Sequence, residues 1–319
     1  MIAGEMVRTS IVIAATTLMT AAPSGPWSPG GSPSQLERPA SIAELWTDPG
    51  AIEQRDAYSG PGGPGNAPAA GAAFEVTALD VTGYSRGYTV TDSQGRVWDV
   101  KLGAEAQPEV VASRVLWLVG YRQPAVYFVP AWRRKGDDRR QPSGRFRFQS
   151  DHTSTGQWSW TDNPFVGTRE LNGLVAVNLL LNNWDLKTSN NRLYSTPPSA
   201  GEPARWFVVQ DVGASLGGTA WPIGTRNDVD RFEAQRFVVA ADGALQFDYR
   251  GRHREVVEKV TADDVIWACR LLDRISDRQW IDIFKAAAYP DAVAARYRAH
   301  LQAKIAEGLA LAGESGVKP

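Results

Sequence analysis

The sequence predicts an α+β fold of two lobes, in which a β-rich first half precedes a mostly helical second half. Short β-rich runs surround a single helical pattern between residues 74 and 148. Helical patterns fill most of the chain from about residue 262 to residue 311. The chain has 319 residues, of which 43% are hydrophobic. It is therefore long and apolar enough to bury a core in each lobe.

The expected first lobe, residues 73–160, begins with a hairpin. Residues 74–79 alternate like a strand, and so do residues 87–91. A turn that contains glycine separates the second of these runs from the β-rich residues 96–101. Two such runs joined by a short turn are typical of antiparallel strands.

A helix is expected next, over residues 108–121, because apolar side chains recur there at helical spacing. Residues 125–129 predict another strand. Residues 131–145 are basic and predict a surface loop, which is the usual role of such a charged run. Residues 145–148 alternate between arginine and phenylalanine, which favours an edge strand.

The expected second lobe, residues 161–319, carries one long helix before its polar motifs and three helices after them. The first helical pattern covers residues 168–181. A strand is predicted at residues 206–210, after a hairpin insertion predicted at residues 196–201. The last three helical patterns cover residues 262–275, 277–287 and 291–311.

The first 72 residues are expected to precede the folded lobes. An apolar run at residues 11–19 follows Arg8 and precedes small residues, which is typical of a secretory signal peptide covering residues 1–22. This predicts a secreted or periplasmic protein, with a cytoplasmic one as the alternative. The run is too short for a transmembrane span. Residues 23–72 have the composition of a disordered linker, with a short helical turn at residues 43–46 docked on the body.

Composition excludes several classes of site. The formal net charge of −1 gives no electrostatic argument for binding nucleic acid. Cys269 is the single cysteine, so an intrachain disulfide and a multi-thiolate zinc site are both excluded. The three histidines, His152, His253 and His300, do not have the spacing of metal ligands.

The strongest chemical signal is Asp185-Leu186-Lys187-Thr188-Ser189-Asn190, which follows the helical pattern at residues 168–181. A carboxylate such as Asp185 can accept the proton of an acceptor hydroxyl, and Lys187 can neutralise a transferring phosphoryl group. Asn190 can place a neutral oxygen on Mg²⁺. Taken alone, Asp185 is equally well read as a loop cap.

A second polar motif, Asp211-Val212-Gly213, ends the predicted strand at residues 206–210. The spacing within D-L-K-x-x-N resembles the catalytic loop of the protein-kinase-like superfamily, and Asp211 stands where that family has its D-F-G aspartate, although the segment between the two motifs is longer than in ordinary protein kinases. The resemblance covers about residues 74–290 and implies a two-lobed kinase fold with a reduced helical C-lobe. It also implies that Asn190 and Asp211 hold Mg²⁺ or Mn²⁺.

The resemblance implies further roles in the first lobe. Lys101 would contact the α- and β-phosphates of ATP, with Glu109 as its ion-pair partner and Glu105 as a rival. Gly83 and Gly87 would belong to a degenerate glycine-rich loop over the phosphates.

Two departures narrow the resemblance. Asn183 and Trp184 stand before Asp185, where the family has His and Arg, and no A-P-E segment follows Asp211. Both departures direct the resemblance toward atypical members, namely HipA-like kinases, phosphatidylinositol kinases and secretory-pathway protein or glycan kinases.

The predicted function is therefore ATP-dependent phosphate transfer to a hydroxyl of an unidentified protein, lipid or glycan. A pseudokinase-like module that binds nucleotide without catalysis is one alternative, and nucleotidyl transfer on the same fold is another. Trp158 and Trp160 are expected to pack near the hinge, although stacking on a sugar also fits their chemistry.

Overall fold

The computed structural model describes residues 41–69, 71–81, 85–150, 152–196, 203–220, 224–241 and 244–314. The expected signal peptide, the first part of the expected linker, Gly83 and most of the insertion at residues 196–201 lie outside these ranges. Within the described residues, no helix combines the length and the apolar character that crossing a bilayer requires.

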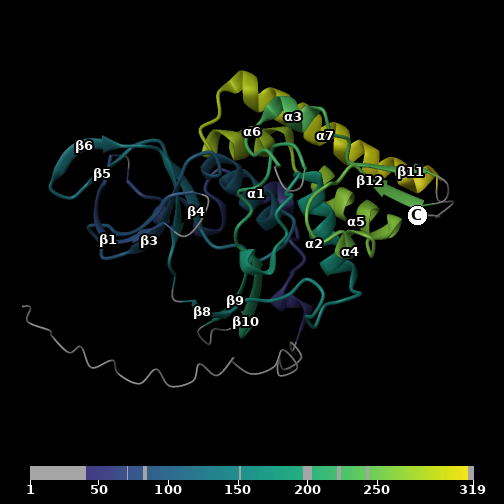
Figure 1. Ribbon diagram of the computed structural model, residues 1–319, viewed down its shortest axis with the longest axis horizontal. Coiled ribbons are helices and arrows are strands. Elements are labelled where there is room, and N and C mark those ends of the chain that lie inside the picture. Colours follow the sequence, from purple (N-terminus) through teal and green to yellow (C-terminus); the bar gives the residue numbers. More distant parts are fainter. Residues whose placement is uncertain are drawn as a thin grey trace, which may run out of the picture. The chain divides into compact units, whose positions relative to one another are not determined.

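The first lobe is built on a seven-stranded sheet in the order β4-β7-β3-β2-β1-β5-β6, on the left of Figure 1. All neighbouring strands are antiparallel except β1 and β5, which are parallel. The strands are β1 (Ala73–Asp80), β2 (Gly87–Thr91), β3 (Val97–Leu102), β4 (Val126–Val129), β5 (Trp132–Arg134), β6 (Asp137–Gln141) and β7 (Gly144–Phe148). The strands expected from the hairpin pattern are thus present.

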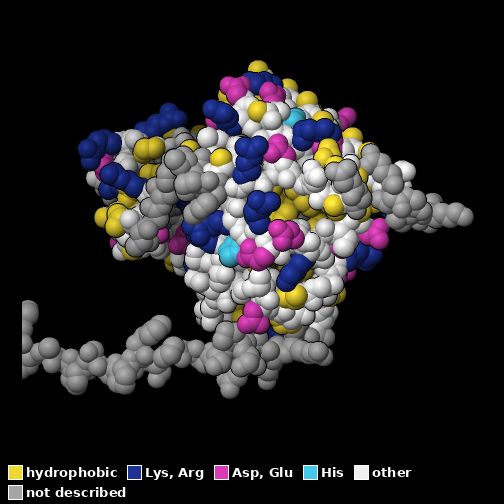
Figure 2. Space-filling view, turned by 45° about the vertical axis from the view of Figure 1, so that its right-hand side comes forward, with side chains coloured by type: hydrophobic (Ala, Val, Ile, Leu, Met, Phe, Trp, Pro, Cys, Tyr) yellow, Lys and Arg dark blue, Asp and Glu magenta, His cyan; other side chains and the backbone are white. Residues whose placement is uncertain are grey.

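The sheet differs from expectation at two places. The segment expected to be a basic loop forms the hairpin β5–β6, because Trp132 is fully buried and fixes its strand against the core. Its basic residues remain on the surface, where Figure 2 shows Lys and Arg gathered at one end of the molecule. In addition, β7 is not an edge strand, since it pairs with β3 on one side and β4 on the other.

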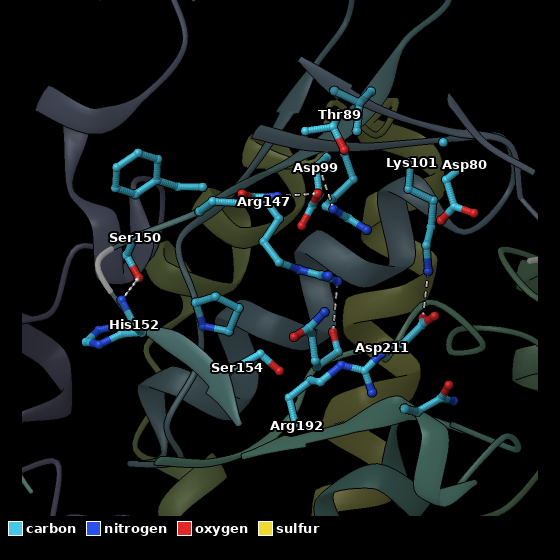
Figure 3. A pocket seen from close by; sticks show the side chains of 18 of the residues that line it. Asp80, Thr89, Asp99, Lys101, Arg147, Ser150, His152, Ser154, Arg192 and Asp211 are labelled. Atoms are coloured by element: carbon cyan, nitrogen blue, oxygen red, sulfur yellow. Dashed lines mark hydrogen bonds and ion pairs between the residues drawn. The ribbon is translucent and has the colours of Figure 1, made fainter. Parts of the chain in front are cut away.

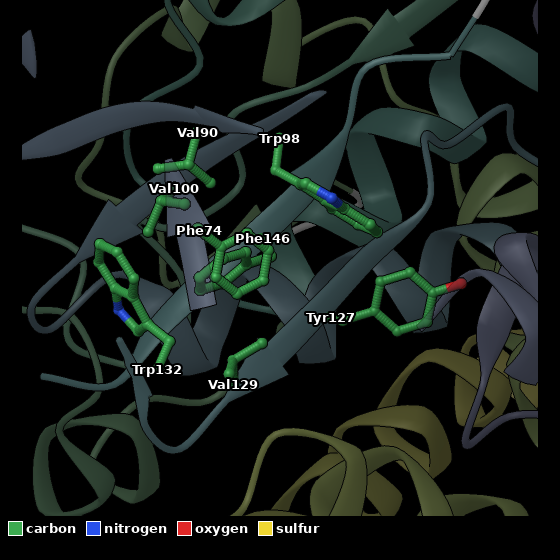
Figure 4. Packing of buried hydrophobic residues seen from close by; sticks show 8 residues of the cluster. All are labelled: Phe74, Val90, Trp98, Val100, Tyr127, Val129, Trp132 and Phe146. Carbon is green, nitrogen blue, oxygen red and sulfur yellow. The ribbon is translucent and has the colours of Figure 1, made fainter. Parts of the chain in front are cut away.

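One face of the sheet holds the core of the first lobe. Aromatic and β-branched side chains from β1, β2, β3, β4, β5 and β7 pack there (Figure 4). Phe146 lies 5.0 Å from the ring of Phe74 and 5.7 Å from that of Trp132. Because side chains alternate across a strand, the neighbours of Phe146 point to the opposite face. That face is the one that carries the polar site described below.

Helix α1 (Ala106–Leu118) contacts β4 and β7 of the sheet. Its range agrees with the helical pattern expected at residues 108–121, shifted by two or three residues at each end. Eleven of its 13 residues are buried, and Glu109 is one of them. The helix is therefore an inner element, and it carries Glu109 in its first turn, facing β3.

The second lobe contains the expected long helices, on the right and at the top of Figure 1. They are α2 (Arg169–Leu180), α5 (Ala262–Asp273), α6 (Asp277–Ala286) and α7 (Asp291–Glu314), and the shorter helices are α3 (Val229–Glu233) and α4 (Arg254–Val257). Thr261 and Ser276 cap α5 and α6 in reciprocal capping boxes. Both helices begin at the residue where the sequence predicted them and end within two residues of the predicted end.

Two small sheets complete the second lobe. One has the order β10-β9-β8 and the other pairs β11 with β12. Their strands are β8 (Thr153–Gly156), β9 (Asn191–Ser195), β10 (Arg205–Val209), β11 (Val238–Ala241) and β12 (Ala244–Phe247). β8 lies within the range expected for the first lobe but pairs with β9 of the second. Trp158 and Trp160 are buried beside this sheet, as their packing interpretation expects.

Residues 41–69 are structured, in contrast to the linker expected there. They form four 3₁₀ turns, at Ile42–Glu44, Ile52–Gln54, Gly60–Gly62 and Pro64–Asn66. Leu45 and Ile52 are fully buried, and the indole Nε1 of Trp46 donates to the carbonyl of Val119 at 2.7 Å. The turn expected near residues 43–46 is present and docks on the body. The composition of the segment predicted disorder, but the burial of Leu45 and Ile52 and the hydrogen bond of Trp46 hold it on the body.

Candidate functional site

An open cavity of about 540 Å³ lies between the polar face of the first sheet and the strands β9 and β10 (Figure 3). We call it the cleft. Its lining includes four predicted site residues, Gly87, Lys101, Asn190 and Asp211. The charged side chains that line it are Asp80, Asp99, Lys101, Arg145, Arg147, Arg192 and Asp211.

Lys101 reaches three carboxylates from β3. Its Nζ lies 2.7 Å from Asp211 Oδ1, 3.0 Å from Glu109 Oε2 and 3.5 Å from Glu105 Oε2. Burial alone would lower the pKa of this ammonium, but Glu109 and Asp211 outweigh burial and raise it. Lys101 therefore stays charged, and both the expected partner and its rival contact it.

Glu109 is fully buried and is shared by three cations. Besides Lys101, Arg145 Nε lies 2.8 Å and Arg147 Nη2 2.5 Å from Glu109 Oε1. Burial would raise the pKa of this carboxyl, but the two arginines and Lys101 hold it below its ordinary value. The ionised carboxylate thus fixes α1 against β3 and β7.

Asp211 follows β10 and faces the cleft, with 37% of its side chain exposed. Burial of part of the group would raise its pKa, yet Lys101 and then Arg147 and Arg145 lower it strongly. Gly213 is required two residues later, because an added Cβ would lie 2.8 Å from the Cβ of Glu105. The short D-x-G motif therefore brings a charged carboxylate next to Lys101 and lets the chain pass Glu105.

Asn190 ends a 3₁₀ turn, Thr188–Asn190, directly before β9. Its main-chain carbonyl accepts from the amide of Asp211 at 3.1 Å, so the two residues predicted to hold a metal are neighbours. Its side-chain Nδ2 donates to the carbonyl of Asp185 at 2.7 Å. That bond directs the amide nitrogen toward Asp185 and leaves the amide oxygen as the acceptor.

Asp185 and Lys187 lie outside the cleft lining as the described residues define it. Lys187 Nζ donates to Asp185 Oδ2 at 2.8 Å, and Arg252 Nε lies 3.4 Å from Asp185 Oδ1. Asp185 is connected to the cleft through Asn190. The sequence analysis did not identify Arg252, which lies 67 residues further along the chain in a loop without a recognisable motif.

Of the two predicted loop glycines, Gly87 lies in β2 and lines the cleft. An added Cβ there would lie 3.1 Å from the carbonyl oxygen of Val100 and 3.2 Å from the Cβ of Asp80. Close approach of the strands therefore explains this glycine. Gly83 lies outside the described residues.

Two arginines that line the cleft, Arg145 and Arg147, were not predicted from the sequence. Arg145 is the cross-strand partner of Lys101, and Arg147 that of Asp99. Arg147 Nη2 also donates to the carbonyl of Gln210 at 3.2 Å, which ties β7 to the residue before Asp211. The alternation of arginine with phenylalanine at residues 145–148 was the available signal, since buried arginines require a buried acid.

The donor set suits a divalent cation bound together with a phosphate group. A carboxylate and a carboxamide oxygen are hard ligands of the kind that Mg²⁺ and Mn²⁺ prefer, and such ions usually keep phosphate oxygens and water as their other ligands. Asp211 already attracts a cation, since Lys101 lies on it. The described residues contain no group of three His, Cys, Asp or Glu side chains that could hold a metal alone.

Comparisons with known proteins bear on the fold. No protein-family model matches the sequence, and no curated protein is significantly similar to it. The structure is similar to the crystal structure of a Helicobacter pylori proinflammatory kinase, CtkA, with a TM-score of 0.52 and 10% sequence identity. The match covers 77% of this chain and 97% of that chain. The chain therefore has a two-lobed, protein-kinase-like α+β fold.

Proposed function

We propose that this protein is an ATP-dependent phosphotransferase of the atypical kinase type, active with Mg²⁺ or Mn²⁺ on an acceptor hydroxyl. One observation carries the proposal. The ammonium of Lys101 joins Glu109 and Asp211 at 3.0 Å and 2.7 Å, at the wall of a cavity that Asn190 also lines. A charged lysine that a buried acid holds in place can bind the negative phosphates of ATP.

In this proposal the charged and polar residues around Lys101 have distinct roles. Lys101 contacts the phosphates of ATP while Glu109 keeps its side chain in place. Asp211 and Asn190 hold the divalent cation, which neutralises phosphate charge when bound. Arg145, buried beside Glu109, keeps that carboxylate ionised.

Asp185 is the proposed base for the acceptor hydroxyl. Its carboxylate is held by Lys187 and Arg252, while its carbonyl is held by the amide of Asn190. The carboxylate would take the hydroxyl proton as the hydroxyl oxygen bonds to the γ-phosphorus of ATP, and the bond from that phosphorus to the β-phosphate oxygen would break to release ADP. Lys187 would turn to the transferring phosphoryl group. A protein, lipid or glycan can supply the hydroxyl, and HipA-like, phosphatidylinositol and secretory-pathway kinases remain the proposed relatives.

The experiment is calorimetric titration of the protein with ATP and Mg²⁺ or Mn²⁺. Wild type should bind, and Asp211→Asn should bind at least about tenfold more weakly because the variant loses a charged metal ligand. Glu75→Gln, which removes an exposed carboxylate outside the cleft, is the control and should bind like wild type. Absence of binding by wild type, or equal binding by Asp211→Asn, would overturn the proposal.

Asp185→Asn separates transfer from binding. The variant should bind ATP like wild type but lose transfer of labelled γ-phosphate to acceptor fractions by about 10²-fold or more. Wild type that binds ATP without transfer would be a pseudokinase-like module. A product heavier by a nucleotidyl group, seen by mass spectrometry, would assign nucleotidyl transfer instead.

We also propose that the protein is exported, because residues 11–19 have the apolar character of a signal peptide. N-terminal sequencing of the mature protein checks this. A new N-terminus near Ala22 is expected, and an intact Met1 would contradict it.

A further inference from the structure

Two non-glycine residues adopt a left-handed backbone close to the proposed catalytic residues. Asn182, three residues before Asp185, has φ of 55°, and Leu216, five residues after Asp211, has φ of 57°. This conformation is uncommon for leucine because its Cβ crowds the backbone carbonyl. The surrounding structure must therefore impose it.

The two left-handed turns are bonded to each other. The amide of Leu216 donates to the carbonyl of Leu181 at 2.9 Å, and Asn182 Nδ2 donates to the carbonyl of Gly217 at 2.7 Å. A weaker bond of 3.4 Å joins the amide of Trp184 to residue 214. We call residues 181–184 and 214–217 the junction. It connects the segment that leads into Asp185 with the segment that leaves Asp211.

Helix α7 supplies a donor to each half of the junction. Lys304 Nζ donates to Asn182 Oδ1 at 2.6 Å and lies 3.3 Å from the carbonyl of Leu180. Tyr297 Oη donates to the carbonyl of Leu216 at 3.0 Å. The two residues are seven positions apart, or about two helical turns, so they lie on one face of α7.

Lys304 is an unusual choice for packing alone. The residue is 0% exposed, both acceptors are neutral oxygens, and its Nζ lies 4.3 Å from the ring centroid of Phe232. A buried ammonium without a carboxylate costs free energy that a methionine of similar length would not. What the lysine adds is a donor aimed at Asn182, which in turn donates to Gly217.

We infer that Lys304 and Tyr297 are positioning residues, which hold the junction in its left-handed form and thereby place Asp185 and Asp211 for phosphate transfer. The inference rests on the proposed function for the transfer step, although the mechanical link between α7 and the junction does not. Neither residue lines the cleft, and their hydrogen bonds to the junction go to Asn182 and Leu216.

Amide hydrogen exchange tests the mechanical link in the full chain. In Lys304→Met and Tyr297→Phe, exchange should rise about tenfold in residues 181–187 and 214–217, the change expected from one lost hydrogen bond to a strong donor. Exchange in β3 and α1 should stay unchanged. Ala303→Gln, an exposed position on the same helix, is the control and should match wild type throughout.

A second variant keeps the test decisive if Lys304→Met does not fold. Asn182→Gly accepts the left-handed backbone but lacks the bridging amide, so it should show the same local rise in exchange. The inference would be overturned if exchange rose evenly over both lobes. It would also be overturned if Tyr297→Phe and Asn182→Gly showed the same exchange in the junction as Ala303→Gln.

Steady-state kinetics tests the positioning role. In Lys304→Met, kcat should fall about tenfold or more while the Kd for ATP stays within about threefold, because the cleft itself is intact. Local exchange that rises with kcat unchanged would overturn positioning. If wild type transfers no phosphate, the proposed function fails, whereas hydrogen exchange still decides whether α7 holds the junction.

Discussion

At the scale of single residues, Glu109 is the group on which most of the buried charge depends. Its carboxylate compensates Lys101, Arg145 and Arg147, and only 1% of its side chain is exposed. Removing one member of a buried ionic cluster leaves uncompensated charge in a dry site. Glu109→Gln should therefore lower the free energy of unfolding by about 3–5 kcal/mol, measured by urea denaturation.

Glu75 provides the matched comparison for this substitution. It pairs with Lys135 at 3.3 Å, but 61% of its side chain is exposed. Glu75→Gln should change the free energy of unfolding by less than about 0.5 kcal/mol, because exposed pairs are well solvated. Equal effects of the two substitutions would contradict the ionic cluster around Glu109.

Lys304 makes stability depend on pH. Burial lowers its pKa to about 7, against the weaker opposite effects of Glu307 and Asp248. Between pH 7 and about 10.5 the unfolded chain binds more protons at this position than the folded chain, so stability rises with pH. The free energy of unfolding of wild type relative to Lys304→Met should thus increase from pH 7 to pH 10, followed by urea denaturation. If that difference did not change with pH, the pKa of Lys304 would not be lowered in the folded protein.

Single residues also show what the sequence could and could not predict. Lys101, Asn190 and Asp211 were predicted from the resemblance of their motifs to those of the protein-kinase-like superfamily, and the structure brings them to one cleft. Arg147 was not predicted, because the local alternation of arginine with phenylalanine does not reveal its partner Glu109, which lies 38 positions away. Arg252 was missed because its partner Asp185 also lies far away in the sequence.

At the scale of elements, helices α2 and α5 approach closely at Gly173. An added Cβ there would lie 2.3 Å from the indole of Trp267 and 2.9 Å from the hydroxyl of Tyr121. Trp267 has little room to move, since Trp46 packs on it at 5.2 Å. Gly173→Ala should destabilise the protein by about 1–2 kcal/mol, because overpacking exceeds the gain of up to about 1 kcal/mol in helix propensity.

Gly313 in α7 is the control for that substitution, because a Cβ there would meet nothing within 4 Å. Gly313→Ala should be neutral or stabilising by up to about 1 kcal/mol, less if the helix end frays. Thermal unfolding of both variants measures the contrast. A stabilised Gly173→Ala would mean that α2 and α5 lie further apart than described.

The elements that sequence patterns predicted well are those whose signals are local. α5 and α6 have caps and apolar periodicity within the helix itself. β7 was assigned to an edge because its residues alternate between arginine and phenylalanine, and of the short strands of the second lobe only β10 was predicted. Their positions depend on partners that lie far away in the sequence, such as the acid on α1.

At the scale of the whole described fold, residues 41–69 connect the lobes. Trp46 bonds to the end of α1 in the first lobe, while Gln279 of α6 donates to the carbonyl of Ile52 at 2.7 Å. Because one segment packs on both lobes, they should unfold together. Calorimetry should show a single transition with equal calorimetric and van't Hoff enthalpies. Leu45→Ala should lower the midpoint of that transition, because the cavity it leaves lowers the free energy of unfolding by about 2–5 kcal/mol. Two resolved transitions would contradict this coupling.

The shared carboxylate of α1 has a consequence for control of the molecule. If α1 swung away from the sheet, Arg145 and Arg147 would stay in β7 without the buried carboxylate of Glu109, and breaking such a buried ionic cluster costs about 3–5 kcal/mol. An idle state reached by displacing this helix is therefore disfavoured by that free energy. Control through ligand supply or through access to the cleft would avoid the cost, because it leaves the contacts of Lys101 in place.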